Sequence, residues 1–390
     1  MNKRKKIRIG IDARFYGPKQ KGLGRYVQKL IENLEKNDSN NEYVIFLRKE
    51  NWDKYQSINP NFKKILADYQ WYTFTEQIFM PFKIMREKVD LMHFPHFNVP
   101  IFCPVPFVIT IHDLILKRFQ TRRASTLGFI KYWIKNMVYQ LVILFAVKRA
   151  SKIIAVSNFT KKDILKYFRV KSKKIKVIYE GVSENLDKQR PCLENLRPLQ
   201  RPYFQGTASN ACPRIKYLLY VGNAYPHKNL ERLILAFNKI LKEEKDLKLI
   251  LVGELDYFYK RLQKISSSNV IFTDFVSDEE LSNLYQNARL YIFPSLCEGF
   301  GLPPLEAMAY NLPIVSSDSS CLPEILGDAA VYFNAENIDD MVDKIKLVLN
   351  NEELQKELIS KGREQIGKYS WEKMSKEILD VYVMWYNEIT

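Results

Sequence analysis

The chain has 390 residues, 46% of them hydrophobic and 27% charged, with 14 Gly and 17 Pro, a composition that excludes a disordered chain, a collagen-like repeat and a small disulfide scaffold. At roughly 100 to 200 residues per domain, this length predicts two domains. Sixty Lys and Arg outnumber 44 Asp and Glu, and the resulting net charge of +16 indicates an anionic partner such as nucleic acid, a membrane surface or an acidic substrate.

Short β-branched and aromatic runs alternate with longer segments of helical period, a pattern typical of parallel α/β sheets. In the first half the pattern predicts strands at 7–12, 43–47, 91–94, 107–112, 152–157 and 175–180, with helices between them, notably at 24–36, 127–150 and 158–168. Ser157 is the expected N-cap of the last helix, because its hydroxyl can accept a backbone N–H of the first turn.

The periodicity disappears in a segment rich in Pro, Asn and Gln, and we interpret residues 186–213 as an interdomain linker. It resumes with strands at 217–222, 247–253, 269–275, 290–294 and 313–317, and with helices after Lys228, near Asp278, from Pro303 and from Asn337. The expected fold is therefore α/β, with an N-terminal domain at 1–185, a C-terminal domain at 214–370 and a final helix at 371–390. Open parallel sheets bind ligands beyond the carboxyl ends of their strands, so a cleft between the two domains is the expected site.

The positive charge is concentrated in the first half. Residues 1–190 hold 38 basic and 16 acidic side chains, and the stretch 117–176 holds 17 basic residues with the single acid Asp163. In the helix of this stretch, aromatic residues and Met alternate with lysines, which favours a helix lying on an anionic bilayer; the residues are Phe129, Lys131, Tyr132, Trp133, Lys135, Met137 and Tyr139. The second half of that helix, with Leu141, Val142, Leu144 and Phe145, is expected to pack on the sheet. A merely solvated basic face is the alternative.

The five cysteines form no CxxC pair and no metal-ligand spacing, so we expect reduced, mostly buried thiols and a cytosolic protein. The N-terminus lacks the apolar core of a signal peptide, and no apolar run reaches the ~20 residues of a membrane-spanning helix. These observations predict a cytoplasmic protein that associates peripherally with the inner face of the membrane.

The most informative segment is FPSLCEGFGLPPLEAMA at 293–309. A strand ends here, and a glycine loop precedes Pro303 and Pro304, which suit a first helical turn. The backbone amides of Phe300, Gly301 and Leu302 would then lie at a helix N-terminus, where they suit a phosphate. Two carboxylates, Glu298 on the loop and Glu306 one turn inside the helix, can accept hydrogen bonds from sugar hydroxyls.

The segment EGFGLPPLEAMA resembles the Glu-x7-Glu signature of the retaining glycosyltransferases of the GT-B fold, family 4, also called glycosyltransferase group 1. Further similar segments follow the order of that family and extend the resemblance over nearly the whole chain: 10–27, 110–114, 153–164, 220–230 and 319–334. The resemblance implies two Rossmann-like domains facing across a cleft, with a final helix that crosses back to the N-terminal domain. It also implies that the C-terminal domain binds a nucleotide diphosphate sugar and that the N-terminal domain binds the acceptor.

The resemblance also implies roles for individual residues. Glu306 would bind the ribose and Glu298 the donor sugar, while Lys228 and the amides of residues 300–302 would bind the diphosphate. His112 would lie near the donor sugar, and Gly22 with Gly24 would let the first domain close on the phosphates. The implied mechanism retains the anomeric configuration: the leaving phosphate helps to deprotonate the acceptor, without an enzyme nucleophile, a metal or another cofactor.

One departure from the family concerns the diphosphate. Many relatives carry Arg at the position of Asn223, so a second phosphate-binding cation is unassigned, and Arg25 and Lys21 are the candidates. Asn223 itself remains an expected donor-binding residue.

Simpler interpretations accompany several of these residues. A Gly-Leu-Gly segment alone is more often a helix start than a phosphate site, and His112 alone is more often a core histidine. We interpret His93 and His96 as structural or cleft-lining, and Asp12 as the cap of a turn.

The sequence thus predicts a hexosyltransferase, with GDP-mannose favoured as donor and a lipid-linked or cell-surface glycan as acceptor. The expected partners are the nucleotide sugar, the glycan or glycolipid acceptor and an anionic membrane surface, without nucleic acid. Two alternatives stay open. One is a nucleic-acid-binding protein that uses the basic half, and the other is a non-catalytic subunit that binds a nucleotide sugar.

Overall fold

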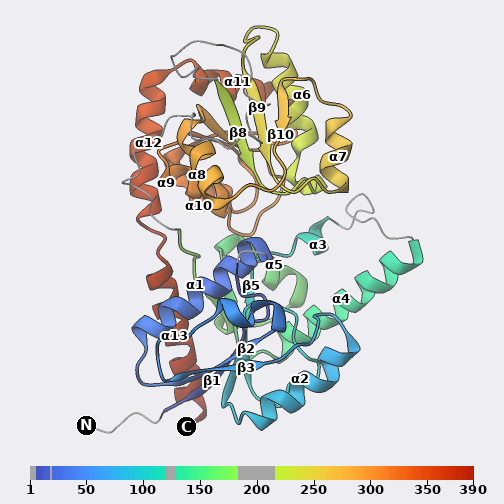
Figure 1. Cartoon of the computed structure of the whole chain (residues 1–390), viewed down its shortest axis with the longest axis vertical. Helices are drawn as coiled ribbons and strands as arrows, with labels where there is room; N and C mark the ends of the chain where they lie inside the picture. Colours follow the sequence, from blue (N-terminus) through green and yellow to red (C-terminus); the bar gives the residue numbers. More distant parts are fainter. Residues whose placement is uncertain (1–5, 18–19, 120–128, 183–215) are drawn as a thin grey trace. The chain divides into compact units, whose positions relative to one another are not determined.

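The computed structural model describes residues 6–17, 20–119, 129–182 and 216–390, with the side chains of a few residues in these ranges left undescribed. It divides into two compact units, residues 1–181 with 369–390 (unit 1) and residues 182–368 (unit 2), each built on a parallel sheet (Figure 1). The expected linker at 186–213 lies outside the described residues.

Unit 1 contains a seven-stranded sheet in the order β3-β2-β1-β4-β5-β6-β7, and all its strand pairs are parallel. The strands are β1 Arg8–Asp12, β2 Glu42–Leu47, β3 Phe62–Leu66, β4 Leu91–Phe94, β5 Phe107–Ile111, β6 Lys152–Ala155 and β7 Ile175–Val177. Short runs of Val, Ile, Leu and Phe, buried on both sides, are typical of strands in the middle of a parallel sheet. The strand order places the carboxyl ends of β4, β5 and β7 along one edge.

The helices of unit 1 cover both faces of this sheet. They are α1 Lys21–Asn37, α2 Phe74–Arg86, α3 Ile115–Arg118, α4 Phe129–Arg149, α5 Asn158–Phe168 and α13 Trp371–Ile389, with 3-10 turns at Lys49–Lys54 and Ser172–Lys174. Right-handed crossovers place α1 on one face and α2, α4 and α5 on the other. On the first face α13 packs beside α1 (Figure 1), where Asn37 Nδ2 donates to Ser375 Oγ over 3.1 Å. The last helix of the chain is therefore part of unit 1.

Unit 2 contains a six-stranded parallel sheet in the order β10-β9-β8-β11-β12-β13. Its strands are β8 Tyr217–Val221, β9 Lys248–Val252, β10 Val270–Phe272, β11 Leu290–Phe293, β12 Ile314–Ser317 and β13 Ala330–Phe333. Its helices are α6 Leu230–Ile240, α7 Tyr257–Gln263, α8 Asp278–Asn287, α9 Leu302–Ala309, α10 Leu322–Leu326, α11 Ile338–Leu349 and α12 Glu352–Ile366, with 3-10 turns at Pro226–Lys228 and Gly327–Ala329.

Several local predictions are tested by this structure. The cap at Ser157 is confirmed, since its Oγ accepts the N–H of Thr160 over 3.1 Å. The first helix was expected from residue 24 but begins at Lys21. The expectation for the second half of α4 is wrong in part. Leu141, Leu144 and Phe145 are 40–48% exposed, whereas Val142 and Ile143 bury against the sheet. Tyr139, expected at a lipid interface, is also buried, because the helix turns that position inward.

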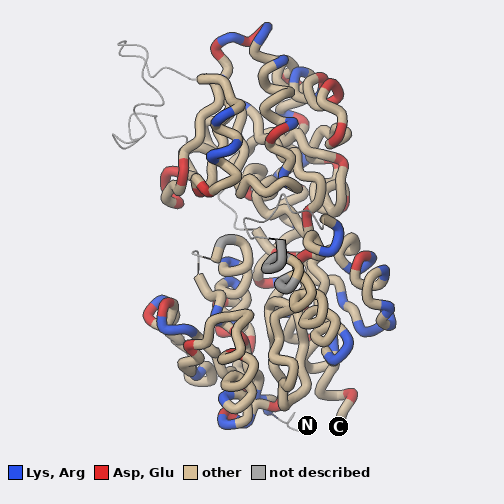
Figure 2. Tube along the Cα trace, turned by 90° about the vertical axis from the view of Figure 1, so that its right-hand side faces the viewer, with Lys and Arg blue, Asp and Glu red and all other residues tan. Residues whose placement is uncertain are grey.

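Charged residues lie mainly on the helices and loops of both units (Figure 2). Part of the basic stretch is bonded internally: Arg118 forms a two-pronged ion pair with Asp163, and Lys174 Nζ donates to the carbonyls of Val147 and Lys148. In the part of the chain that the structure describes, no helix is both long and apolar enough to span a bilayer.

Candidate active site

The carboxyl edge of the second sheet brings Lys228 and Glu298 together. Lys228 Nζ donates to Glu298 Oε1 over 2.6 Å, and the two side chains are only 14% and 10% exposed. Lys228 ends the turn after β8, and Glu298 lies on the loop after β11. Hydrogen bonds join the two segments: the N–H of Leu296 donates to the carbonyl of His227, and Asn229 Nδ2 donates to the carbonyl of Pro294. Two residues separated by 70 positions are thereby fixed as one pair.

Asn229 holds this turn in its conformation. It has a left-handed backbone with φ of 62°, a conformation that Asn tolerates better than most residues. Its amide also donates to the carbonyl of Ala335 over 2.8 Å, so the turn is tied to the segments that follow β11 and β13. An ammonium group has three N–H donors, and Lys228 gives one of them to Glu298. The pair can therefore present both a cation and a carboxylate oxygen to a ligand.

The loop after β11 leads into α9 as expected. Gly301 has φ of 96°, which favours glycine, and α9 begins at the next residue with two prolines in its first turn. Those prolines have no N–H, so the backbone donors around this helix start belong to Phe300, Gly301 and Leu302. Their position at an N-terminus favours an anion through the helix dipole.

Glu306 lies one turn further along α9. It is partly buried, and Tyr285 OH donates to its Oε2 over a long 3.4 Å. Glu298 thus lies on the loop and Glu306 on the helix of one segment. This arrangement would let the two carboxylates contact different parts of a long ligand.

Asn223, the residue at the family's Arg position, belongs to the β8 turn. Its carbonyl accepts from Tyr220 OH over 2.8 Å, and its Oδ1 accepts the N–H of Tyr225 over 3.3 Å. Its polar atoms thus hold the turn, and Asn223 brings no positive charge. The side chain of Lys21 lies outside the described part, and Arg25 is the fifth residue of α1 in unit 1.

His112 follows β5 at the carboxyl edge of the first sheet and is hydrogen-bonded through both ring nitrogens. Nδ1 lies 2.8 Å from Glu180 Oε1, and Nε2 lies 2.9 Å from the carbonyl oxygen of Pro95. Its own carbonyl accepts from Thr160 Oγ1 over 3.2 Å. Glu180 follows β7 and Pro95 follows β4, so three strand ends converge on this ring. Sequence reasoning missed Glu180, which is 68 residues from its partner.

These contacts decide the charge of His112. Burial disfavours the imidazolium, but the hydrogen bond and negative charge of Glu180, the Pro95 carbonyl and the charge of Asp113 together raise the pKa of His112 above its usual value. Two acceptors facing two ring nitrogens are satisfied when both nitrogens carry hydrogen. The protonated ring and the Glu180 carboxylate therefore form an ion pair at the edge of the first sheet.

The glycines of the first turn of α1 differ in their surroundings. A Cβ at Gly24 would lie 2.0 Å from the carbonyl oxygen of Gly17, so this position needs glycine for close packing. A Cβ at Gly22 would meet no atom within 4 Å, and Gly22 is exposed. Close packing alone therefore explains why residue 24 is glycine. Packing does not explain glycine at residue 22, where the space beside the helix start is open.

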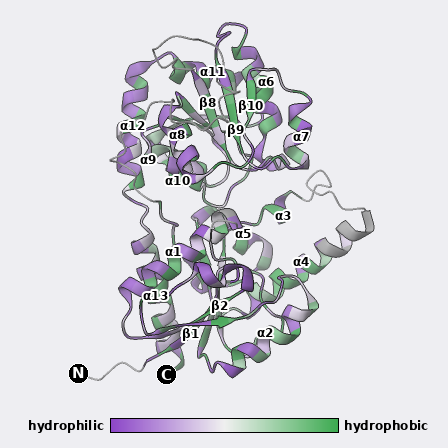
Figure 3. Ribbon diagram, in the orientation of Figure 1, coloured by the Kyte–Doolittle hydropathy of each residue, from purple (hydrophilic) through white to green (hydrophobic). Residues whose placement is uncertain are grey.

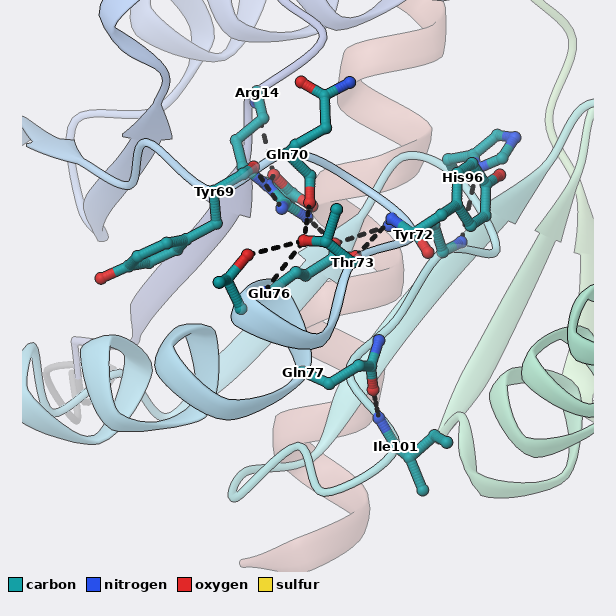
Figure 4. A network of polar contacts seen from close by, with 12 residues as sticks. Arg14, Tyr69, Gln70, Tyr72, Thr73, Glu76, Gln77, His96 and Ile101 are labelled. Carbon is teal, nitrogen blue, oxygen red and sulfur yellow. Dashed lines mark hydrogen bonds and ion pairs between the residues drawn. The ribbon is translucent and has the colours of Figure 1, made fainter.

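A buried ion network beside β1 was also missed by the sequence analysis. Arg14 is fully buried, forms a two-pronged pair with Asp12 at 2.7 and 2.8 Å, and reaches Glu76 of α2 over 2.5 Å (Figure 4). Glu76 also accepts from Asn98 Nδ2 and from the N–H of Tyr72. Asp12 thus does more than cap a turn. The Asp-x-Arg spacing and a lone acid in the apolar helix 74–86 were the available signals.

Two other expectations concern His93 and His96 and the thiols. His93 is fully buried between Tyr382 OH and Thr110 Oγ1, and burial lowers its pKa to about 3. His96 Nδ1 accepts the N–H of Asn98. His93 is therefore structural, one of the two roles expected for it, whereas the expectation that His96 is structural or cleft-lining stays a prediction. The described cysteines, Cys103, Cys297 and Cys321, are buried and form no disulfide, and the described residues contain no cluster of three or more potential metal ligands.

Comparison with known proteins adds to this geometry. Residues 21–186 match the family described as Glycosyltransferase Family 4, and residues 209–365 match the family described as Glycosyl transferases group 1. The O-antigen chain mannosyltransferase RfbU of Salmonella typhimurium is 27% identical over 79% of this chain and 77% of its own length. The O-antigen chain mannosyltransferase B of Escherichia coli is 28% identical over 76% of this chain and 75% of its own.

The fold is also similar to solved structures. A sucrose-phosphate synthase from Thermosynechococcus elongatus has a TM-score of 0.75 at 17% identity, and the match covers 98% of this chain and 100% of that one. Two Rossmann-like parallel-sheet domains in one chain define the GT-B fold of glycosyltransferases, as expected. The chain belongs to the family 4, or group 1, glycosyltransferases.

Proposed function

We propose that this glycosyltransferase moves a hexose, with mannose from GDP-mannose favoured, from a nucleotide diphosphate sugar to a lipid-linked or cell-surface glycan. The observation that carries the proposal is the buried Lys228–Glu298 pair beside the start of α9. Two similar proteins are named as O-antigen chain mannosyltransferases, which supports mannose as the sugar and a polysaccharide intermediate as the acceptor.

In this proposal unit 2 binds the donor. The diphosphate accepts hydrogen bonds from Lys228 and from the amides at the start of α9, Glu298 binds hydroxyls of the sugar, and Glu306 binds the ribose. Lysine acts on phosphate as a point charge, and a preorganised cation with helix-terminus amides stabilises the charge that grows on a leaving diphosphate. Asn223 shapes the same turn without adding a second cation.

The proposed reaction retains the configuration of the transferred sugar. The leaving diphosphate accepts the proton of the acceptor hydroxyl on the face where the new bond forms, so the residues bind and orient the reactants and no enzyme carboxylate becomes covalently attached. Unit 1 binds the acceptor, and its His112, oriented by the hydrogen bond to Glu180, is the residue of its sheet edge that takes part in transfer. No metal or other cofactor takes part in this proposal.

The basic character of unit 1 supports an anionic, membrane-borne acceptor. The stretch 117–176 carries 17 basic residues and one acid, which fits attraction to the cytoplasmic face of a membrane. The enzyme would then work in the cytoplasm at that surface, where it meets both a water-soluble donor and a lipid-linked acceptor.

Single substitutions test the donor site. Lys228→Ala and Glu306→Ala should each lower the transfer rate on the order of a hundredfold or more, the usual cost of losing one preorganised transition-state contact, without loss of fold. Lys346→Ala is the matched control, since Lys346 is also an ion-paired lysine of unit 2, bonded to Glu243 over 2.7 Å. Full turnover in both site variants would reject the assignment.

Ligand binding distinguishes the donors and the alternative functions. At equal concentrations of GDP, UDP and ADP, the nucleotide with the lowest Kd should stabilise the protein most, and we expect this to be GDP. A ligand present at a hundred times its Kd adds about 2.7 kcal/mol to the apparent stability. Stabilisation without sugar transfer to any acceptor would favour a non-catalytic subunit. A salt-dependent gel shift with nucleic acid, without nucleotide binding, would favour the nucleic-acid-binding alternative.

A further inference from the structure

Helix α2 is apolar on both its inner and its outer side. Met80 and Ile84 are fully buried in the core of unit 1. On the outer side Phe74 is 88% exposed and Phe82 is 62% exposed, and three more hydrophobic residues, each about half exposed, extend this stripe: Ile78, Phe79 and Met85. A surface helix of a soluble protein normally carries polar residues on this side.

A neighbouring loop continues the apolar surface. Phe102 follows β4 and is 78% exposed. The residue before it, Ile101, is held from two sides: its N–H donates to Gln77 Oε1 of α2 over 2.8 Å, and its carbonyl accepts from Arg149 Nη1 of α4. Phe102 therefore lies on a loop that is tied to both helices.

Helix α4 repeats the pattern of α2. Val142, Ile143, Ala146 and Val147 are buried on its inner side, and its outer side exposes 40–58% of five hydrophobic residues: Met137, Val138, Leu141, Leu144 and Phe145. In Figure 3, green marks hydrophobic residues along both α2 and the described part of α4. Both helices cover the same face of the sheet, and Ile101, the neighbour of Phe102, is hydrogen-bonded to both of them; their outer sides and Phe102 are here called the α2–α4 face.

The exposed charged residues within the segments that form this face have one sign. In residues 74–86, 101–105 and 137–149 the basic residues are Lys83, Arg86, Lys148 and Arg149, and the acid Glu76 is buried in its bond to Arg14. These segments therefore show no exposed carboxylate. A contiguous exposed apolar surface normally marks a site of interaction. A twofold contact with a second copy would place these cations opposite their own equivalents, which is unfavourable.

We propose that the α2–α4 face inserts into the headgroup region of an anionic bilayer. Phe74, Phe82 and Phe102 reach the boundary of the acyl chains, and the basic side chains bind lipid phosphates. The inference deepens the proposed function, on which it rests for a membrane-borne acceptor. The basic stretch would attract the protein to the anionic membrane, and the α2–α4 face adds the surface that inserts into it.

Vesicle binding by the full chain tests the inference. The partition coefficient is measured by sedimentation with phosphatidylcholine vesicles that contain or lack phosphatidylglycerol. The double variant Phe82→Ser/Phe102→Ser should bind anionic vesicles on the order of a hundredfold more weakly, since burial of each Phe contributes about a tenfold factor. Phe275→Ser is the matched control, because Phe275 is 86% exposed in unit 2 and should leave binding unchanged.

The outcomes separate this inference from the proposed function. Equal binding by the double variant and the wild type overturns it, as does equal binding to neutral and anionic vesicles. Self-association that disappears in the double variant also overturns it, by identifying a second copy as the partner. Transfer to a soluble acceptor analogue should be unaffected in the double variant. Wild-type protein that binds vesicles through these residues but transfers no sugar would reject the proposed function and leave the inference standing.

Discussion

Replacing Glu180 by Gln tests whether Glu180 raises the pKa of His112 and stabilises its protonated ring. In the wild type Glu180 Oε1 lies 2.8 Å from His112 Nδ1, and the side chains of His112 and Glu180 are 18% and 6% exposed. Gln keeps the shape and can still accept one hydrogen bond, but it removes the negative charge. A hydrogen bond between charged groups contributes about 1.5–3 kcal/mol to stability, so we expect Glu180→Gln to lower the free energy of unfolding by about that amount where the pair is formed.

The loss should depend on pH in a definite direction. The pKa of His112 is raised above its ordinary 6.5, since the bond to Glu180 and its charge outweigh the cost of burial. A group whose pKa is raised in the folded state stabilises the fold fully below the unfolded value, and this contribution is lost as the pH rises through the folded-state pKa. The gap between wild type and variant should therefore be full below the unfolded-state pKa of 6.5 and should shrink as the pH rises through the raised folded-state pKa of His112.

Urea unfolding at several pH values measures the gap, and NMR of the imidazoles measures its cause. The chain has four histidines, and burial lowers the pKa of His93 and His96 to about 3 and that of His227 to about 4. At pH 6 His112 should thus be the single imidazolium in the wild type, with a lower pKa in the variant. Glu388→Gln, which breaks the exposed pair with Lys152, is the control and should cost less than about 1 kcal/mol.

Two results would refute the reasoning: a gap that does not change with pH, or a wild-type spectrum in which Nδ1 of His112 carries no proton and Glu180 is the neutral acid.

Further predictions concern stability, donor transfer and membranes. Arg14→Met should destabilise the protein by about 3–5 kcal/mol in urea unfolding, because it leaves Asp12 and Glu76 buried without their cation; a loss under 1 kcal/mol would contradict this. Gly24→Ala should lower the melting temperature because its Cβ would lie 2.0 Å from Gly17 O, whereas Gly22→Ala should be neutral or slightly stabilising. Lys228→Ala should lose transfer while Lys346→Ala keeps it, and Phe82→Ser/Phe102→Ser should lose anionic vesicle binding while Phe275→Ser keeps it.

The α/β class and most strands followed from local pattern, because strands buried on both faces are short apolar runs. The missed strands, β3 and β13, are edge strands. β3 has the sequence FKKIL, in which two lysines interrupt the apolar run, as is common where one side of a strand faces solvent. Periodicity also failed for α2, because a helix that is apolar inside and outside has no polar stripe to mark its period.

The loop and helix start at 298–309 were predictable from sequence because their signals are local. Glycine at a left-handed position, two prolines in a first turn and a carboxylate on each side occupy one run of sequence. The ion pair between Lys228 and Glu298 was not predictable, since it depends on hydrogen bonds between two loops that follow different strands. Lys228 and Glu298 could each be singled out in the sequence, but the ion pair between them could not be predicted.

His93 and His112 show why the charge of a site needs the fold. Both lie at or just after neighbouring strands of one sheet, and both are hydrogen-bonded through both ring nitrogens. The partners of His93 are the hydroxyls of Tyr382 and Thr110, which can donate or accept, so a neutral ring satisfies them and burial lowers the pKa. The partners of His112 are a carboxylate and a carbonyl, which only accept, and they raise it. The difference between a structural histidine and a cationic one therefore resides in Tyr382 and Glu180, which lie 289 and 68 residues away.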